Sequence, residues 1–176
     1  DYLDIINLKS KQLLQIINNI IDISKIEANQ INIKHQSFSV NQMLKELFEE
    51  YQIELKEWKK DHIQLNIPDE NLYKDVLIKS DKSRLRQILS NLISNAIKYT
   101  EDGYIEIGYT QEEKNVIFYV KDTGIGISQE KQEIIFQRFR QAEDYSTRKY
   151  GGTGLGLSIS KALVKLLGGK IWLKSE

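Results

Sequence analysis

The stretch "NVIFYVKDTGIGIS", residues 115–128, runs from a strand pattern into a loop with two glycines one residue apart. The preceding "YIEIGYT", residues 104–110, has a similar strand pattern, and the polar "QEEK" between them predicts a hairpin. Gly124 and Gly126 follow an acidic residue, and glycine lets the backbone come close to a flat or phosphorylated group. The stretch therefore predicts an antiparallel pair of strands that ends in a candidate binding loop.

Helix and strand patterns alternate along the rest of the chain. A helix is predicted from Ser39 as N-cap to the "KKD" at 59–61, and another over 82–100 with Asp81 as N-cap. The residues expected on their buried faces are Leu44, Leu47, Phe48, Tyr51, Leu55 and Trp58 in the first, and Leu85, Ile88, Leu89, Leu92 and Ala96 in the second. Further predicted elements are strands at 62–68, 75–81 and 170–175, a short helix at 129–136 and a helix that opens at a glycine loop within 151–169.

These elements interleave, yet the strands at 104–110 and 115–122 are joined by a hairpin and not by a crossover. The predicted fold class is therefore α+β: a two-layer α/β sandwich in which helices cover one face of a mixed, mostly antiparallel sheet. A chain of 176 residues, 40% of them hydrophobic, can bury one sizeable core. We expect this domain to span residues 32–176.

Residues 1–31 predict a long helix that forms part of a bundle. They contain no Gly or Pro, and their apolar residues recur at spacings of three and four. The apolar stripe consists of Leu13, Ile16, Ile20 and Ile23, widened by Leu14, Ile17 and Ile21. So wide a stripe is typical of a bundle of several helices, which this chain does not supply alone. A partner is the first interpretation, and a helix that lies on its own domain is the alternative.

Composition excludes several classes of function. Lys plus Arg and Asp plus Glu both number 25, so no net charge draws the chain to nucleic acid or to an anionic membrane. The chain has no cysteine, which excludes disulfides and thiolate metal sites and fits a reducing compartment. It has no apolar run of about 18 residues. We therefore expect a cytoplasmic chain without direct membrane contact, which could be the cytoplasmic part of a membrane-bound receptor.

Two common nucleotide motifs are absent from the glycine-rich segments 122–128 and 151–156. A Walker loop needs a lysine and a hydroxyl residue after its last glycine, but the only Gly-Lys pair, at 169–170, is followed by isoleucine. A dinucleotide-binding fingerprint needs a glycine three residues after Gly126 or Gly154, and neither position has one. Either segment could still be an ordinary turn.

Asn91, Asn95 and Lys98 share one face of the 82–100 helix, because their spacings are four and three. Apolar neighbours bury the adjacent face, which predicts that the asparagine pair lies at the edge of the core, facing a cleft. An amide oxygen suits a Mg²⁺ ion that keeps most of its waters and binds substrate phosphates, and lysine adds a positive charge. Two solvated surface asparagines are the alternative.

Four segments resemble, in order, the sequence boxes of sensor histidine kinases. They are "NLISNAIKYT" (asparagine box), "DTGIGIS" (first glycine box), "IFQRFRQ" (phenylalanine box) and "GGTGLGLSISKALVKLLGGKIWLKSE" (second glycine box). The resemblance is strong over 81–176. In addition, "LLQIINNIIDISKIEANQ" at 13–30 is similar to the second helix of the dimerisation and phosphotransfer hairpin of these kinases.

The resemblance implies a nucleotide fold shared with DNA gyrase and a heat-shock chaperone, with ATP and Mg²⁺ as cofactors. It implies that the γ-phosphoryl of ATP is transferred to a histidine on the first hairpin helix and then relayed to an aspartate of a response-regulator receiver domain. It also implies a homodimer formed through the N-terminal helix bundle.

At the phosphate end, the resemblance implies that Asn95 ligates Mg²⁺ while Asn91 and Lys98 contact the phosphates. The second glycine box would wrap the phosphates at the start of the last helix, where free N–H groups favour anions. Its implied cofactor-binding residues are Gly152, Thr153, Gly154, Leu155 and Gly156. The polar segment 141–150 would form a lid that is mobile without nucleotide.

At the adenine end, the resemblance implies that Asp122 accepts a hydrogen bond from the adenine amino group. Guanine presents a carbonyl oxygen there, so the carboxylate would select ATP over GTP. The other residues implied on this side are Tyr99, Gly124, Gly126, Ile127 and Leu157. For Ile127 and Leu157 an ordinary core position is an equal alternative.

The chain departs from the family pattern at the phosphate acceptor, which is a histidine followed by an acidic residue. Its two histidines, His35 and His62, are followed by glutamine and isoleucine. We therefore expect the chain to begin after the acceptor helix, and to stop at "KSE" before a final strand of the family.

Two alternative functions remain. The resemblance implies that ATP-hydrolysing relatives and related serine kinases have a glutamate at the position that corresponds to Asn91. That glutamate acts as general base. An amide cannot take a proton, so Asn91 favours phosphorylation of a histidine, whose neutral ring nitrogen attacks unaided. The second alternative is a pseudokinase or interaction module that binds nucleotide, or nothing, and only relays conformation.

Overall fold

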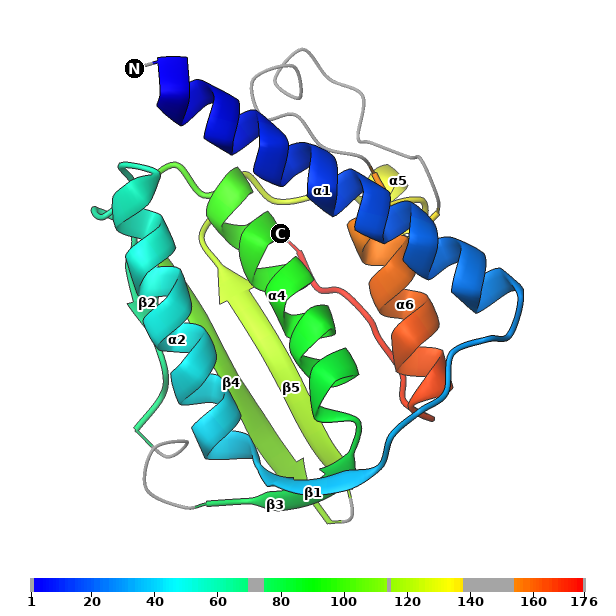
Figure 1. The fold of residues 1–176 in the computed structure, drawn as a ribbon. Coiled ribbons are helices and arrows are strands. Elements are labelled where there is room, and N and C mark those ends of the chain that lie inside the picture. The colour runs from blue at the N-terminus through cyan, green and yellow to red at the C-terminus, as the bar shows by residue number, and fades with distance from the viewer. Residues whose placement is uncertain (1, 70–74, 114, 138–153, 176) are drawn as a thin grey trace.

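The computed structural model describes residues 2–69, 75–113, 115–137 and 154–175 (Figure 1). Its elements in chain order are α1 (Tyr2–Glu27), β1 (Gln36–Ser39), α2 (Val40–Glu57), β2 (Gln64–Asn66), β3 (Leu77–Ser80), α4 (Lys82–Tyr99), β4 (Tyr104–Glu112), β5 (Asn115–Asp122), α5 (Gln129–Gln132) and α6 (Gly156–Leu166). None of the described helices is both long and apolar enough to cross a lipid bilayer.

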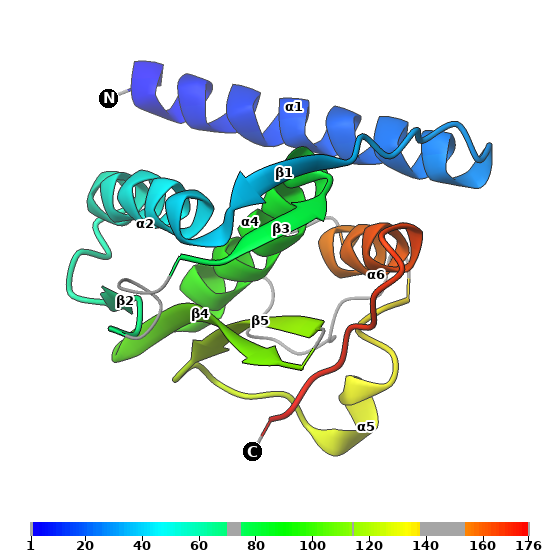
Figure 2. The ribbon, with the colours of Figure 1, turned by 90° about the horizontal axis from the view of Figure 1, so that it is seen from below.

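The strands form two small sheets. β4 is central in the larger one, where it pairs with β2 in parallel and with β5 in the predicted antiparallel hairpin. β1 and β3 pair antiparallel in the smaller sheet. Figure 2 shows α2, α4 and α6 side by side over one face of the larger sheet. The predicted α+β two-layer architecture with a mixed sheet is therefore confirmed.

The main core lies between this sheet and helices α2 and α4. Ile105 and Ile107 of β4 point into it and are buried, as the alternation of side chains along a strand requires. From α4 the core receives Ile93 and Ile97, which are completely buried. The predicted buried face of α4 included neither of them, and it included Leu92, which is half-buried and packs against a second cluster.

α2 begins as predicted, because the Ser39 Oγ atom accepts a hydrogen bond from the Gln42 N–H at 3.0 Å. The prediction for Trp58 is wrong, since this side chain is 42% exposed. The helix ends at Glu57 and the chain turns through Lys59, whose φ is +56°, so Trp58 no longer follows the buried stripe.

Three other elements differ from the sequence-based expectations. The strand β1 at 36–39 was not predicted, because its ladder partner among the described residues, β3, lies far along the chain. The predicted strand at 170–175 is absent from the described residues, as no neighbouring strand offers it a ladder. The helix expected over 129–136 ends at Gln132, and the chain continues beyond it as turns.

α1 is the long helix that the sequence predicts, and its C-terminal part packs on the domain. Ile23 and Ile26 contact a second cluster made by Ile88 of α4 and by Leu155, Ile159 and Leu163 around α6. Polar contacts add to this packing, because the Asp22 carboxylate accepts hydrogen bonds from Gln87 at 2.7 Å and Arg84 at 3.4 Å. This part of α1 therefore lies against the domain.

The rest of the α1 stripe is open to solvent. Leu13 and Leu14 are 57% and 60% exposed, and Ile17, Ile20 and Ile21 are between 43% and 51% exposed. An apolar stripe of this width has no partner among the described residues and remains the surface on which the bundle prediction rests.

Asp81 holds the start of α4 through three hydrogen bonds. Its Oδ1 accepts from the Arg84 N–H at 3.1 Å and the Ser83 hydroxyl at 2.7 Å, and its Oδ2 accepts from the Lys34 N–H at 2.9 Å. Burial raises the pKa of this carboxyl, but the hydrogen bonds from Lys34, Ser83 and Arg84 outweigh it and leave the pKa below its ordinary value of 3.8. The charged form of Asp81 is thus favoured by folding.

Asp81→Ala is expected to lower the free energy of unfolding by about 1–2 kcal/mol at pH 7, since it removes an N-cap with a charged acceptor. A pKa that is lower in the folded state gives stability above the unfolded pKa, and this stability is lost as the pH falls through the folded pKa. The difference between the two proteins should therefore shrink below about pH 4.

Urea denaturation between pH 3 and pH 7 measures this difference. Asp81→Asn is the matched control, because it keeps the acceptor oxygen and cannot titrate; its stability difference from Asp81→Ala should stay constant over the same range. A wild-type advantage over Asp81→Ala that persists undiminished at pH 3 contradicts the assignment.

Candidate functional site

The helix α4 carries the predicted Asn91, Asn95 and Lys98, and both glycine segments come to it. The first segment passes the C-terminal end of α4, where the Ile125 N–H donates to the Tyr99 carbonyl oxygen at 3.2 Å. The second opens α6, which lies beside α4 (Figure 2). Two glycine loops that are about 30 residues apart in sequence therefore flank the same helix.

Gly124 makes the closest approach. A Cβ atom at this position would lie 2.6 Å from the Tyr99 carbonyl oxygen and 2.8 Å from the Asp122 Oδ1 atom, so no side chain fits without a shift of the backbone. Gly126 follows with a φ of +67°, a conformation that glycine adopts without strain. The two glycines thus allow the conformation of this loop and its close contact with the end of α4.

Asp122 lies at the end of β5 and is exposed. Its Oδ1 accepts a hydrogen bond from the Gly124 N–H at 2.9 Å, which fixes the carboxylate relative to the loop. Its Oδ2 makes no hydrogen bond with any described residue. The carboxylate therefore has one oxygen available for a donor on a ligand, as an adenine amino group requires.

Thr123 completes the turn at Asp122. Its backbone N–H donates to the Tyr104 carbonyl oxygen at 3.2 Å, and its Oγ1 accepts from the Tyr104 N–H at 3.0 Å. These bonds join the loop to the start of β4, directly after Asp122.

Asn91 connects α4 to the start of α6. Its Nδ2 donates to the Gly156 carbonyl oxygen at 3.3 Å and lies 3.2 Å from the Ser160 Oγ. Gly154, with a φ of +68°, and the completely buried Leu155 lead into the helix. Because the Leu155 side chain belongs to the second cluster, only its backbone could contact a ligand. Leu157 is half-buried.

Part of the predicted site lies outside the described residues. This applies to Gly152 and Thr153 of the second glycine box and to the whole of the predicted lid at 141–150.

Asn95 and Lys98 lie further along the same side of α4. The Asn95 amide is half-exposed and makes no hydrogen bond within the described part of the chain, so its oxygen is free to ligate a cation. The Lys98 Nζ donates to the Tyr99 hydroxyl at 2.9 Å and lies 4.6 Å from the centre of the Tyr99 ring. A positive charge therefore lies beside Tyr99, whose carbonyl oxygen bonds to the first glycine loop.

No cluster of three or more acidic or histidine side chains that could hold a metal occurs in the ranges described. A protein-made cage for a cation is thus not present there. A Mg²⁺ ion needs none, because it keeps several waters and binds through one or two side chains plus substrate phosphates. The single amide of Asn95 fits that mode of binding.

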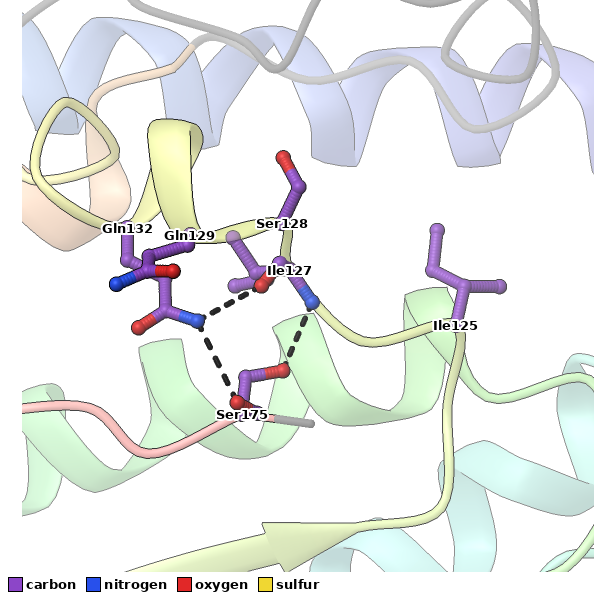
Figure 3. Close-up of a pocket in the computed structure, with 6 residues that line it drawn as sticks. All are labelled: Ile125, Ile127, Ser128, Gln129, Gln132 and Ser175. Carbon is purple, nitrogen blue, oxygen red and sulfur yellow. Dashed lines mark hydrogen bonds between the residues drawn. The ribbon is translucent and has the colours of Figure 1, made fainter.

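An open pocket of about 600 Å³ adjoins the first glycine loop (Figure 3). Its lining residues are Ile125, Ile127, Ser128, Gln129, Gln132 and Ser175. Ile127, predicted on the adenine side, is half-buried in its wall. The Gln132 side chain closes one side of the pocket, where it contacts both Ile127 and Ser175.

Sequence reasoning did not identify Thr123, Ser160, Gln132 or Ser175 as parts of the site. Each acts through a hydrogen bond to a partner distant in the chain or to a backbone atom. Polar residues of this kind are common in loops and carry no pattern that distinguishes them.

Comparison with known proteins agrees with this geometry. Residues 80–176 match the family model described as histidine kinase-, DNA gyrase B- and HSP90-like ATPase. The chain is 38% identical over 176 residues to the circadian input-output histidine kinase CikA of Synechococcus elongatus, covering 99% of this chain and 23% of CikA. The chain thus spans between 8% and 23% of the length of the curated relatives named in this comparison.

Two solved structures extend the comparison. Full-length ShkA in complex with AMPPNP matches with a TM-score of 0.76 and 26% identity, covering 95% of this chain and 34% of ShkA. The histidine kinase ThkA in complex with the response regulator protein TrrA matches with a TM-score of 0.70 and 24% identity, covering 99% of this chain and 47% of ThkA; this likeness concerns the fold alone.

Proposed function

This chain belongs to the family of histidine kinase-, DNA gyrase B- and HSP90-like ATPases and contains the ATP-binding catalytic domain found in sensor histidine kinases; from this premise we propose that it phosphorylates a histidine. The γ-phosphoryl group of ATP is transferred to the histidine of a helical hairpin and passes from there to a response-regulator aspartate. The observation that carries the proposal is the approach of both glycine segments to α4, the first at its C-terminal end and the second at Asn91.

The adenine end of the site is formed by the loop after β5. The free Oδ2 of Asp122 accepts a hydrogen bond from the adenine amino group, while Gly124 and Gly126 let the ring approach the backbone. Ile127 and Tyr99 line this end. Since the Asp122 carboxylate is fixed by Gly124 before a nucleotide arrives, recognition needs little ordering of the loop.

The phosphate end is formed by α4 and the start of α6. Asn95 would hold a Mg²⁺ ion and Lys98 would face the phosphates, while the N–H groups at the start of α6 would favour their negative charge. A Mg²⁺ ion held there would supply positive charge against the phosphates during transfer. The residues of this chain position the γ-phosphoryl group, and the histidine of the hairpin supplies the nucleophile.

Asn91 supports transfer to histidine over hydrolysis or transfer to serine. Its amide cannot accept a proton from water or a hydroxyl group, and its nitrogen is engaged with Gly156 and Ser160. A neutral imidazole has a lone pair on nitrogen and needs no base. Asn91 therefore orients α6 against α4 and contacts the phosphates.

The partners and location follow from the same proposal. The exposed apolar stripe of α1 packs in a helix bundle with a second copy of the chain, and a receiver domain of a response regulator takes the phosphoryl group. The ThkA–TrrA complex is a precedent for such a partner in a protein of this fold. We place the chain in the cytoplasm, the compartment that supplies ATP.

Incubation with γ-labelled ATP and Mg²⁺, alone and with a separate hairpin that carries a histidine followed by an acidic residue, tests the proposal. We expect acid-labile, base-stable label on the hairpin and none on the chain alone. Transfer should be slow at micromolar protein, because the two parts lack the millimolar effective concentration of a short covalent link. Chelation of Mg²⁺ should abolish it.

Asn95→Ala is expected to lose at least tenfold in transfer rate, whereas Asn115→Ala, an exposed asparagine at the start of β5, should match the wild type. Label on the chain alone that disappears with His35→Ala or His62→Ala would contradict the assignment of the acceptor. ATP binding without transfer to any cognate hairpin would favour the pseudokinase.

A further inference from the structure

The backbone of Ile127 is held at both its N–H and its carbonyl oxygen by one group of hydrogen bonds (Figure 3). The Ile127 N–H donates to the Ser175 Oγ at 2.8 Å, and the Ile127 carbonyl oxygen accepts from the Gln132 Nε2 at 2.8 Å. The same Gln132 nitrogen also lies 3.4 Å from the Ser175 carbonyl oxygen. Gln132, Ser175 and the Ile127 backbone therefore form a closed ring of contacts, which we call the Ile127 clamp.

The chemistry of the clamp requires an amide at position 132. Both partners of the Gln132 side chain are carbonyl oxygens, which only accept hydrogen bonds, so the Nε2 group with its two protons must face them. The contacts join three segments: the glycine loop, the short helix α5 and residue 175, which lies 48 positions beyond Ile127.

The clamp acts on one side of the loop, and a different set of bonds acts on the other. Toward its start, the loop is tied to α4 and β4 by the bonds of Ile125 with Tyr99 and of Thr123 with Tyr104. Beyond Gly126, the described residues that hold the backbone of Ile127 are Ser175 and Gln132. Gly126 between them has a φ of +67° and adds no side-chain packing.

We propose that Gln132 and Ser175 are positioning residues that hold the far half of the glycine loop, and with it Ile127, in the conformation that binds the adenine ring. The inference depends on the proposed function, because that function assigns this loop to adenine. In this role both residues act through the backbone of Ile127. Without the clamp, the loop after Gly126 has to be ordered by the nucleotide, and this ordering reduces the affinity.

Calorimetric titration of the whole chain with ATP, ADP and AMP tests the proposal. Gln132→Leu, which keeps the size of the side chain and removes its donor, is expected to weaken binding of all three about two- to twelvefold, the effect of one net hydrogen bond. The factor should be the same for each nucleotide, because they share the adenine ring. Lys98→Ala provides the contrast, since the loss of affinity that it causes should be largest for ATP and smallest for AMP.

Ser175→Ala gives a second, independent test, because it removes only a hydroxyl group and decides the question if Gln132→Leu does not fold. It should weaken binding by a similar factor. The double variant should bind nucleotide about as weakly as the weaker-binding single variant does, because both residues belong to one clamp. Gln52→Leu, an exposed glutamine of α2, is the control for the substitution itself.

The thermal unfolding midpoint without nucleotide separates positioning from a general loss of stability. The proposal expects a change of affinity with a midpoint close to that of the wild type. Unchanged affinity in both single variants, or affinity losses that multiply in the double variant, would overturn it. A wild-type chain that binds no ATP would instead overturn the proposed function, so the two failures are distinguishable.

Discussion

Asp122→Ala is expected to weaken ATP binding about ten- to a hundredfold, since a hydrogen bond to a charged group contributes roughly 1.5–3 kcal/mol. The wild-type chain should prefer ATP to GTP, because guanine presents an acceptor where adenine presents an amino group. Most of this preference should be lost in the variant. Calorimetric titration with both nucleotides in the presence of Mg²⁺ measures affinity and preference together.

Asp122→Asn separates adenine recognition from the order of the loop. Its amide oxygen can still accept the hydrogen bond from the Gly124 N–H, which leaves an NH₂ group in the place of the free Oδ2. Two donors then face each other, and ATP affinity should fall about as far as in the alanine variant. Asp69→Ala, an exposed carboxylate after β2, is the control and should bind like the wild type. Equal affinity of the wild type for ATP and GTP would refute the role given to Asp122.

Ile93→Ala is expected to lower the free energy of unfolding by about 2–5 kcal/mol, the cost of removing a large apolar side chain from a packed core. Ile93 is completely buried in the main core, where α4 packs against α2 and the sheet. For a chain of this size the loss corresponds to a decrease in melting temperature of roughly 4–20 °C. Urea denaturation and thermal unfolding both measure it.

The matched control is Ile53→Ala, the same substitution on α2 at a side chain that is 62% exposed. It should change the free energy of unfolding by no more than about 0.5 kcal/mol. Equal stability losses in the two variants would show that burial in this core does not determine the effect.

Elements whose hydrogen bonds join residues close together in the sequence were predicted well. The N-caps Ser39 and Asp81 bond to N–H groups three residues away, and the β4–β5 hairpin joins adjacent strands. The common face of Asn91, Asn95 and Lys98 follows from helical periodicity alone. Of the proposed site, Gly124 and Gly126 stand out in the sequence because the backbone limits the residues possible there, whereas Asp122 was assigned from the resemblance to the kinase family.

Predictions failed where the surroundings of an element decide the outcome. Ile93 and Ile97 were missed because α4 is central: α2 and the sheet pack on one side, and α6 on the other, so its buried arc is wider than a single stripe (Figure 2). The strand β1 was missed since its hydrogen bonds go to β3, about 40 residues away. Trp58 fits the buried stripe of α2 in sequence, yet the helix ends before it.

By itself, the sequence determined the kinds of residue available to the site and the helix or loop on which each one lies, because these depend on local backbone preferences and side-chain chemistry. Only the tertiary structure decided which of these residues meet. It brings Asn91 to Gly156 and Ser160, Tyr99 to the loop at Gly124, and Ser175 with Gln132 to Ile127. The physical reason is that the apolar surfaces of α4, α6 and the sheet can be buried together in few arrangements, and that packing fixes the relative positions of loops whose own sequences do not.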